Sequence, residues 1–183
     1  MVMTPLDLGK RAAYGAIFVI GVPLLLVVWA ERSAPMIPLP ATGNPVIGGV
    51  VILIGLALIA SGMAGLIRHG RGLPMNAFPP PRFAREGVFR WLRNPIYIGF
   101  GLVTLGASLF ARSPSGLWLV TPVTWLAMAA LVFGHERHDL RKRFGPEALT
   151  PPRLSLSRSG DGAPDLVERL ATLVWVFGPW LLA

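Results

Sequence analysis

The chain has 183 residues, of which 53% are hydrophobic and only 14% are charged, and its formal net charge is +8. Soluble domains carry about a quarter charged residues, so this composition favours a membrane protein over a soluble one. The chain has no cysteine, which excludes disulfides and thiolate metal sites, and its three histidines offer little material for a metal site. Beside long apolar blocks, the net positive charge favours anionic lipid headgroups as partners and argues against nucleic acid.

Long apolar blocks at the start of the chain predict membrane spans, because a helix that crosses a bilayer needs roughly 20 apolar residues. The first block covers about residues 12–30, and Pro23 is expected to kink it. Its length favours a retained span over a signal peptide. The second block covers about residues 46–67. Its glycines thin the helix surface and predict close approach of a neighbouring helix: Gly48, Gly55, Gly62 and Gly65.

Three further apolar segments follow later in the chain. The third block, about residues 95–111, opens with a proline, which suits the first turn of a helix. The fourth block, about 117–134, follows the short turn 112–116, so blocks three and four are predicted to form a tight hairpin. The last segment, 166–182, is short for a span. We expect a fifth span there, an interfacial helix, or a helix leading into a further domain.

Basic residues gather between and after these blocks. Residues 68–94 hold six arginines against one glutamate, and residues 135–165 are also polar and basic, whereas the other loops carry one arginine each, Arg32 and Arg112. By the positive-inside rule, this pattern predicts four spans with both flanking tails in the cytoplasm. We therefore expect a single all-α membrane domain over residues 1–183, a bundle of transmembrane helices in a bacterial inner membrane with a cytoplasmic N-terminus.

The polar residues next to the spans are the candidates for chemistry. They fall at 87–99, where the third span begins, and at 134–145, where the fourth span ends. Because these spans form a hairpin, the two stretches are predicted to meet at one membrane face. The polar pocket expected there contains Arg90, Arg93, Asn94, Tyr97, His135 and Glu136. Such a place suits an enzyme that joins a soluble reagent to a membrane-bound substrate, although arginines and tyrosines at span ends also serve as headgroup anchors.

Two motifs in these stretches have a characteristic order and spacing. The first is Gly87-Val88-Phe89-Arg90 followed by Arg93-Asn94-Pro95-Ile96-Tyr97-Ile98-Gly99, and the second is Glu136, Leu140 and Phe144-Gly145. Together they resemble the signature of the isoprenylcysteine carboxyl methyltransferase and phospholipid methyltransferase family. The resemblance covers about residues 46–153. Where that family has a second glutamate, this chain has Arg137.

The resemblance implies an integral membrane methyltransferase that uses S-adenosylmethionine and acts on a lipid or isoprenoid-type substrate at the cytoplasmic interface. It implies catalytic roles for Glu136, Arg90 and Tyr97. It implies cofactor contacts from Arg93, Asn94, Pro95, Tyr97, Gly99, Gly101, His135 and Glu136, with Gly99 and Gly101 leaving room for the cofactor, and no metal. Two alternatives remain open from the residues: a nicotinamide-dependent membrane reductase with a related helical core, and a non-catalytic membrane module of a larger fusion.

Overall fold

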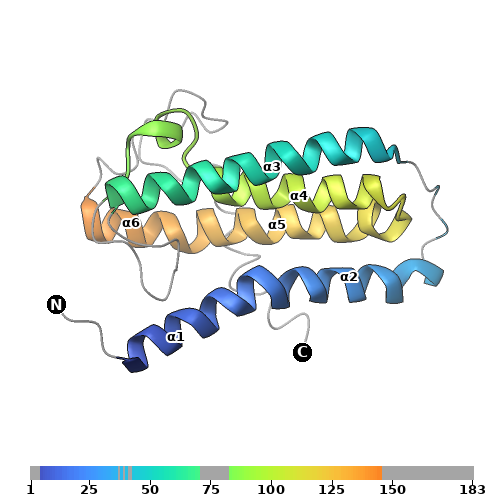
Figure 1. Cartoon of the computed structure of the whole chain (residues 1–183), viewed down its shortest axis with the longest axis horizontal. Helices are drawn as coiled ribbons and strands as arrows, with labels where there is room; N and C mark the ends of the chain where they lie inside the picture. Colours follow the sequence, from blue (N-terminus) through green and yellow to red (C-terminus); the bar gives the residue numbers. More distant parts are fainter. Residues whose placement is uncertain (1–4, 37, 39, 41–42, 71–82, 146–183) are drawn as a thin grey trace.

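The computed structural model describes residues 5–36, 38, 40, 43–70 and 83–145 (Figure 1). Every regular element among them is helical, and these residues contain no strand. The expected all-α class is confirmed for this part of the chain. The possible fifth helix at 166–182 lies outside the described residues.

The first helical run is nearly continuous from residue 5 to residue 36. It consists of α1 (Pro5–Ala16), a π-helical turn (Ile17–Gly21), α2 (Val22–Ser33) and a short 3-10 turn (Ala34–Met36). Pro23 lies in the first turn of α2 and has no N–H to donate. The π-helical turn directly before it absorbs the interruption, and the helix changes direction between α1 and α2 (Figure 1).

The second run, α3 (Pro45–Gly65), continues as a π-helical turn (Leu66–Gly70). Asn44 caps its start, because the side-chain oxygen of Asn44 accepts hydrogen bonds from the N–H groups of Val46, at 2.9 Å, and Ile47, at 3.3 Å. The cap and the following proline explain why the helix begins at this point of an otherwise apolar stretch.

The third run is shorter. A 3-10 turn, η4 (Gly87–Arg90), precedes α4 (Pro95–Phe110). Gly87, the first residue of η4, has φ +63°, a conformation that favours glycine. Pro95 is fully buried in the first turn of α4.

The fourth run contains η5 (Gly116–Val120), α5 (Thr121–Leu131), η6 (Val132–Glu136) and α6 (Arg137–Phe144) without a break. Both η5 and η6 are π-helical turns. The turn η5 precedes Pro122, just as the π-helical turn of the first run precedes Pro23. The Thr121 hydroxyl donates a hydrogen bond to the Gly116 carbonyl at 2.8 Å. The polar residues after the fourth apolar block therefore continue the helix as far as Phe144.

Three of these runs are long and apolar enough to cross a membrane: Ala12–Met36, Pro45–Gly70 and Gly116–Phe144. The expected span at 95–111 is α4, which has 16 residues and is roughly 24 Å long, short of the roughly 30 Å hydrocarbon core of a bilayer. Four full spans are therefore not confirmed. Instead, α4 packs along only part of α3, and η4 packs against the last part of α3.

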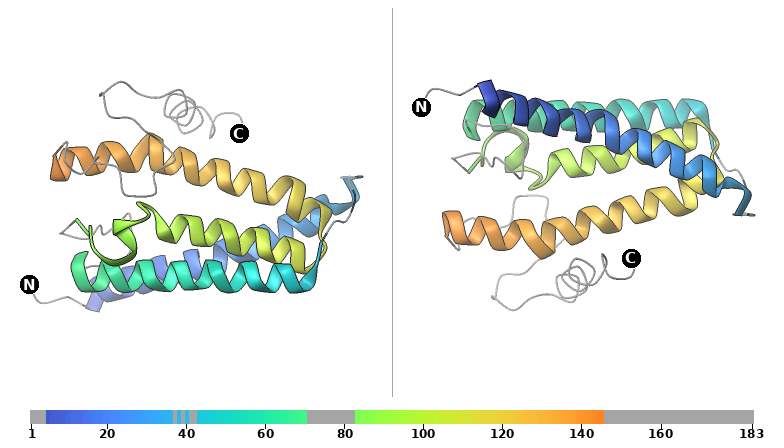
Figure 2. Two further views of the ribbon diagram at one scale, coloured as in Figure 1. Left: turned by 90° about the horizontal axis from the view of Figure 1, so that it is seen from above. Right: turned by 90° about the horizontal axis from the view of Figure 1, so that it is seen from below.

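Glycines let α3 and α4 pack in direct backbone contact. A Cβ atom on Gly48 would lie 2.7 Å from the Gly106 carbonyl oxygen, and one on Gly55 would lie 2.6 Å from the Gly99 carbonyl oxygen. The predicted close approach along this face of the second block is confirmed, because all four of its named glycines are buried. Figure 2 shows the two helices side by side.

Buried hydroxyls hold the turn between α4 and α5. The Ser108 and Thr121 hydroxyls lie 3.2 Å apart, which joins α4 to the start of α5 and confirms the predicted hairpin. Ser115, which is 0% exposed, donates to the Ala30 carbonyl at 2.6 Å. That hydrogen bond ties the first helical run to the rest of the bundle at this end.

The two ends of the bundle differ in charge. The end of α3, the turn η4, the helix α6 and the start of α1 share one end, and the turn between α4 and α5 lies at the other (Figure 1). The first end carries most of the described basic residues, whereas Arg32 and Arg112 stand toward the second. We call the first the basic end, and its charge agrees with the expected positive side.

Candidate functional site

The two polar motifs meet at the basic end, as predicted. The alignment of α4 with α5 brings them together, since a Cβ atom on Gly101 would lie 2.6 Å from the Trp125 ring and 2.9 Å from the Met128 methyl. Because the two helices run in opposite directions, the residues before Gly101 lie level with those after Met128. This places the start of α4 beside η6.

The start of α4 is recessed from the end of the bundle. A Cβ atom on Gly62 would contact Pro95 and Ile96, so α4 begins at the level of Gly62. Since α3 and its π-helical turn run on to Gly70, eight residues later, they extend about 12 Å past the start of α4. The turn η4 lies over the last part of α3, with the Phe89 ring 2.9 Å from the position of a Cβ on Gly65.

Glu136 is the central residue of the site. It ends the π-helical turn η6, in which the N–H of Arg137 bonds to the carbonyl of Val132. The Tyr97 hydroxyl of α4 donates a hydrogen bond to the Glu136 carboxylate. The second carboxylate oxygen, Oε2, is buried and has no hydrogen-bond partner among the described residues. A buried carboxylate oxygen in this state offers a binding point for a cation or a hydrogen-bond donor.

Two arginines accompany Glu136. Arg93, just before α4, interacts electrostatically with both Glu136 and Arg137. Burial and then the nearby positive charge of Arg137 lower the pKa of the Arg93 guanidinium, and the negative charge of Glu136 acts in the opposite direction. The guanidinium carbon of Arg137 lies 5.7 Å from the centre of the Phe133 ring one turn earlier. We call Arg93, Tyr97, Glu136 and Arg137 the polar cluster.

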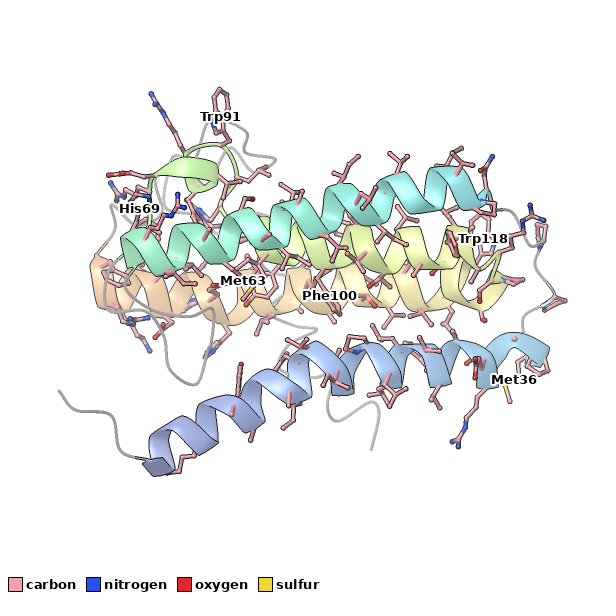
Figure 3. The ribbon with its side chains drawn as sticks, in the orientation of Figure 1. Met36, Met63, His69, Trp91, Phe100 and Trp118 are labelled. Carbon is pink, nitrogen blue, oxygen red and sulfur yellow. The ribbon has the colours of Figure 1, made fainter. Side chains whose placement is uncertain are left out.

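Two contacts between polar side chains flank the polar cluster. Asp139, whose charge also acts on Glu136, lies 3.3 Å from Arg143 one turn further along α6. The His69 ring nitrogen lies 3.2 Å from a carboxylate oxygen of Glu86 and links the end of α3 to the segment before η4 (Figure 3). The first contact lies within α6, and the second joins the end of α3 to the segment before η4.

The comparisons with known proteins supply the family. The model of the phospholipid methyltransferase family matches residues 43–147, which include every residue of the polar cluster. The chain belongs to the phospholipid methyltransferase family. No curated protein and no solved structure matches it. The family and the apolar helices together make this protein an integral membrane methyltransferase.

Some motif residues of this phospholipid methyltransferase family member lie apart from Glu136. Arg90 is exposed at the end of η4, and the next residue, Trp91, points away from the bundle (Figure 3). His135 is exposed although its neighbour Glu136 has a buried carboxylate oxygen. The structure therefore brings Arg93 and Tyr97 to Glu136 and leaves Arg90 and His135 on the surface.

The expectation that Gly99 and Gly101 leave room for a cofactor stays a prediction, and the structure gives both glycines a role in packing. A Cβ atom on Gly99 would meet the Gly55 carbonyl and Ile59 of α3, and the Trp125 ring covers Gly101. Both glycines serve the packing of α4 against its neighbours, because protein atoms fill the space beside them.

Arg137 was not among the residues predicted for the site. In an α-helix, the N–H of Glu136 would bond to the Val132 carbonyl, four residues earlier. In the π-helical turn, the i to i+5 bond draws Arg137 toward the same side. The π-helical turns before Pro23 and Pro122 are each followed closely by a proline, whereas this turn is not, so no local pattern in the sequence predicts it.

Proposed function

We propose that this protein transfers a methyl group from S-adenosylmethionine to a lipid or isoprenoid-type acceptor at the cytoplasmic face of a membrane. The observation that carries the proposal is the buried Oε2 atom of Glu136 within the matched family segment. The cofactor bears two positive groups, a sulfonium and an ammonium, and either is a suitable partner for that oxygen.

The residues around Glu136 fit the remaining groups of the cofactor. The carboxylate of the cofactor can pair with the Arg93 guanidinium. The side chain of Asn94 makes no capping hydrogen bond to α4, so its amide and the first N–H groups of that helix offer further hydrogen bonds. Asn94 and Arg93 adjoin Pro95, which starts α4, so the helix sets their positions.

The chemistry requires alignment above all. The sulfonium supplies both the methyl group and its leaving group. Tyr97 holds the Glu136 carboxylate in one orientation through their hydrogen bond. The residues at the start of α4 would hold the donor while the lipid acceptor approaches from the membrane. Positioning of this kind lowers the entropy cost of bringing two reactants together.

Binding of S-adenosylhomocysteine to the purified protein in detergent tests the proposal. This product keeps the ammonium and carboxylate of the cofactor, so we expect saturable binding. Glu136→Gln removes the charge and should weaken binding roughly tenfold or more, as for other hydrogen bonds to charged groups. The control is Arg141→Gln, an exposed position of α6 that should bind like the wild type.

Two outcomes would contradict the proposal. One is the absence of binding at millimolar S-adenosylhomocysteine. The other is equal binding by the wild type and Glu136→Gln. A parallel titration with a reduced nicotinamide cofactor addresses the reductase alternative, for which we expect no saturable binding.

A further inference from the structure

One segment leads from the end of α6 to the polar cluster. We call residues 83–92, which include η4, the strap. Its first residue, Phe83, has its ring centre 5.7 Å from that of Phe144, the last residue of α6, with 38° between the ring planes. The next residue, Ala84, is buried. The strap ends directly before Arg93, so one residue of the polar cluster is attached to it.

The middle of the strap contacts the end of the second helical run. A carboxylate oxygen of Glu86 lies 3.2 Å from a ring nitrogen of His69, and the Phe89 ring lies 2.9 Å from the position of a Cβ on Gly65. The strap therefore touches α6 at its start and the end of α3 in its middle, and it then continues into α4. Its course determines the direction from which Arg93 approaches the other residues of the cluster.

Each ring of the pair at the start of the strap has an arginine next to it. The guanidinium carbon of Arg85 lies 5.2 Å from the centre of the Phe83 ring, and that of Arg143 lies 4.8 Å from the centre of the Phe144 ring. Both rings are half-buried. Tilted ring pairs and cations near ring faces both favour particular arrangements, so this contact holds the strap in one place on α6.

The helix α6 ends directly after the ring that meets the strap. Gly145 has φ +78°, a conformation that favours glycine, and its N–H donates to the Arg141 carbonyl at 3.0 Å. Phe144 therefore lies in the last turn of α6. This geometry accounts for the Phe144-Gly145 pair of the second motif, because one residue supplies the ring and the other ends the helix.

We propose that Phe83 and Phe144 are positioning residues of the site, and that their ring contact holds the strap against α6 and thereby fixes Arg93. This inference rests on the proposed function, in which Arg93 pairs with the carboxylate of the methyl donor. Neither ring has to touch the donor. When the contact is lost, the strap moves away from α6 in part of the molecules, and the apparent affinity for the donor falls with the fraction in which Arg93 is in place.

Equilibrium binding of S-adenosylhomocysteine to the full chain in detergent is the first measurement. Phe83→Ala and Phe144→Ala should each weaken binding about three- to tenfold, the range expected for one aromatic pair. The double variant should bind at most about twofold more weakly than the weaker single variant, because the second substitution removes a ring that has already lost its partner.

Two further variants separate positioning from general damage. Phe83→Tyr keeps the ring and should bind like the wild type. Phe110→Ala removes an exposed ring at the opposite end of α4 and should also bind like the wild type. The thermal midpoint of each variant shows whether it is folded. Phe83→Leu, which keeps apolar bulk without the ring, replaces the alanine variants if they do not fold.

The position of the strap is the second measurement, and it does not depend on a ligand. The chain has no cysteine, so nitroxide labels can be placed at Arg90→Cys on the strap and Lys142→Cys on α6, which are both exposed positions. We expect a narrow distance distribution, which Phe83→Ala or Phe83→Leu broadens and Phe83→Tyr restores. S-adenosylhomocysteine should narrow the broadened distribution again, because it binds the attached form.

Four results would overturn the inference: folded variants without the ring bind like the wild type, Phe83→Tyr binds as weakly as Phe83→Ala, the losses of the two single variants multiply in the double variant, or loss of the ring leaves the distance distribution unchanged. Binding by the wild type separates the two proposals. If the wild type binds S-adenosylhomocysteine while these results occur, only the positioning role is wrong. If the wild type does not bind it, the proposed function fails and this inference with it.

Discussion

At the scale of single residues, the site depends on the π-helical turn η6, which contains one residue more than a turn of α-helix. In η6 the Arg137 N–H donates to the Val132 carbonyl, five residues earlier, and Glu136 meets Tyr97 of α4 while Arg137 lies near Arg93, just before α4. Such π-helical turns often occur at functional sites. His135 in the same turn is exposed. Neighbouring residues of one motif therefore differ in role because of backbone geometry.

The hydrogen bond from Tyr97 to Glu136 gives the first residue-scale prediction. Tyr97→Phe removes the hydroxyl and keeps the ring, so Glu136 loses the group that orients it. We expect affinity for S-adenosylhomocysteine to fall about fivefold, the effect of roughly 1 kcal/mol for one hydrogen bond. Equilibrium binding measures it.

The other tyrosine of the chain is the natural control. Tyr14 stacks on Phe18 in the first helical run, with ring centres 4.6 Å apart, so Tyr14→Phe should bind like the wild type. If Tyr97→Phe also bound like the wild type, the hydrogen bond to Glu136 would have no part in cofactor binding.

At the scale of elements, the contact between α3 and α4 positions the site. The glycines of α3 admit the backbone of α4, and this register sets the level at which α4 begins. Because α4 has only 16 residues, its start is recessed beside η6. A change in the register would separate Tyr97 from Glu136, so packing within the bundle controls the chemistry at its end.

Neighbouring glycines of α3 provide a matched test of this contact. A Cβ on Gly48 would lie 2.5 Å from the Phe110 backbone nitrogen and 2.7 Å from the Gly106 carbonyl oxygen, whereas one on Gly49 meets nothing within 4 Å. Gly48→Ala should therefore destabilise the protein by about 1–3 kcal/mol. Gly49→Ala should be neutral or stabilising by up to about 1 kcal/mol, because alanine favours a helix.

Thermal unfolding in detergent measures both substitutions. The midpoint of Gly48→Ala should lie clearly below that of Gly49→Ala. Equal midpoints would show that the two helices can separate slightly at no cost, and would contradict the close backbone contact.

At the scale of the whole molecule, the first helical run is attached mainly at the end away from the polar cluster. Its main contact with the other runs is between α2 and η5, where Ser115 donates to the Ala30 carbonyl at 2.6 Å. Toward its start, the run passes apart from α5 in the views of Figures 1 and 2. Large apolar side chains such as Ile20, 64% exposed, face outward, as expected beside lipid.

This arrangement predicts that Ser115→Ala loosens the first helical run. Loss of the hydrogen bond costs about 1 kcal/mol and should raise the population of detached conformations about fivefold. Nitroxide labels at Ile20 and Leu126, which are both exposed, report the separation of the first run from α5. We expect a broader distance distribution in electron spin resonance.

The control for this variant is Ser61→Ala. Ser61 is exposed and donates only to the Leu58 carbonyl of its own helix, at 2.9 Å. It should leave the distance distribution unchanged. An unchanged distribution in Ser115→Ala as well would mean that other contacts hold the first run.

The amino-acid sequence by itself determined the all-helical class, the basic end and the meeting of the two motifs. These features depend on local quantities: the length of an apolar block, the charge beside it and the short turn at 112–116. The tertiary structure decided the length of α4 and which motif residues face inward. Gly99 is a packing residue because α3 fills the space beside it, and Arg137, at the end of a π-helical turn, lies with Glu136 near Arg93. Both outcomes depend on contact with a neighbouring helix, which the pattern of one segment does not contain.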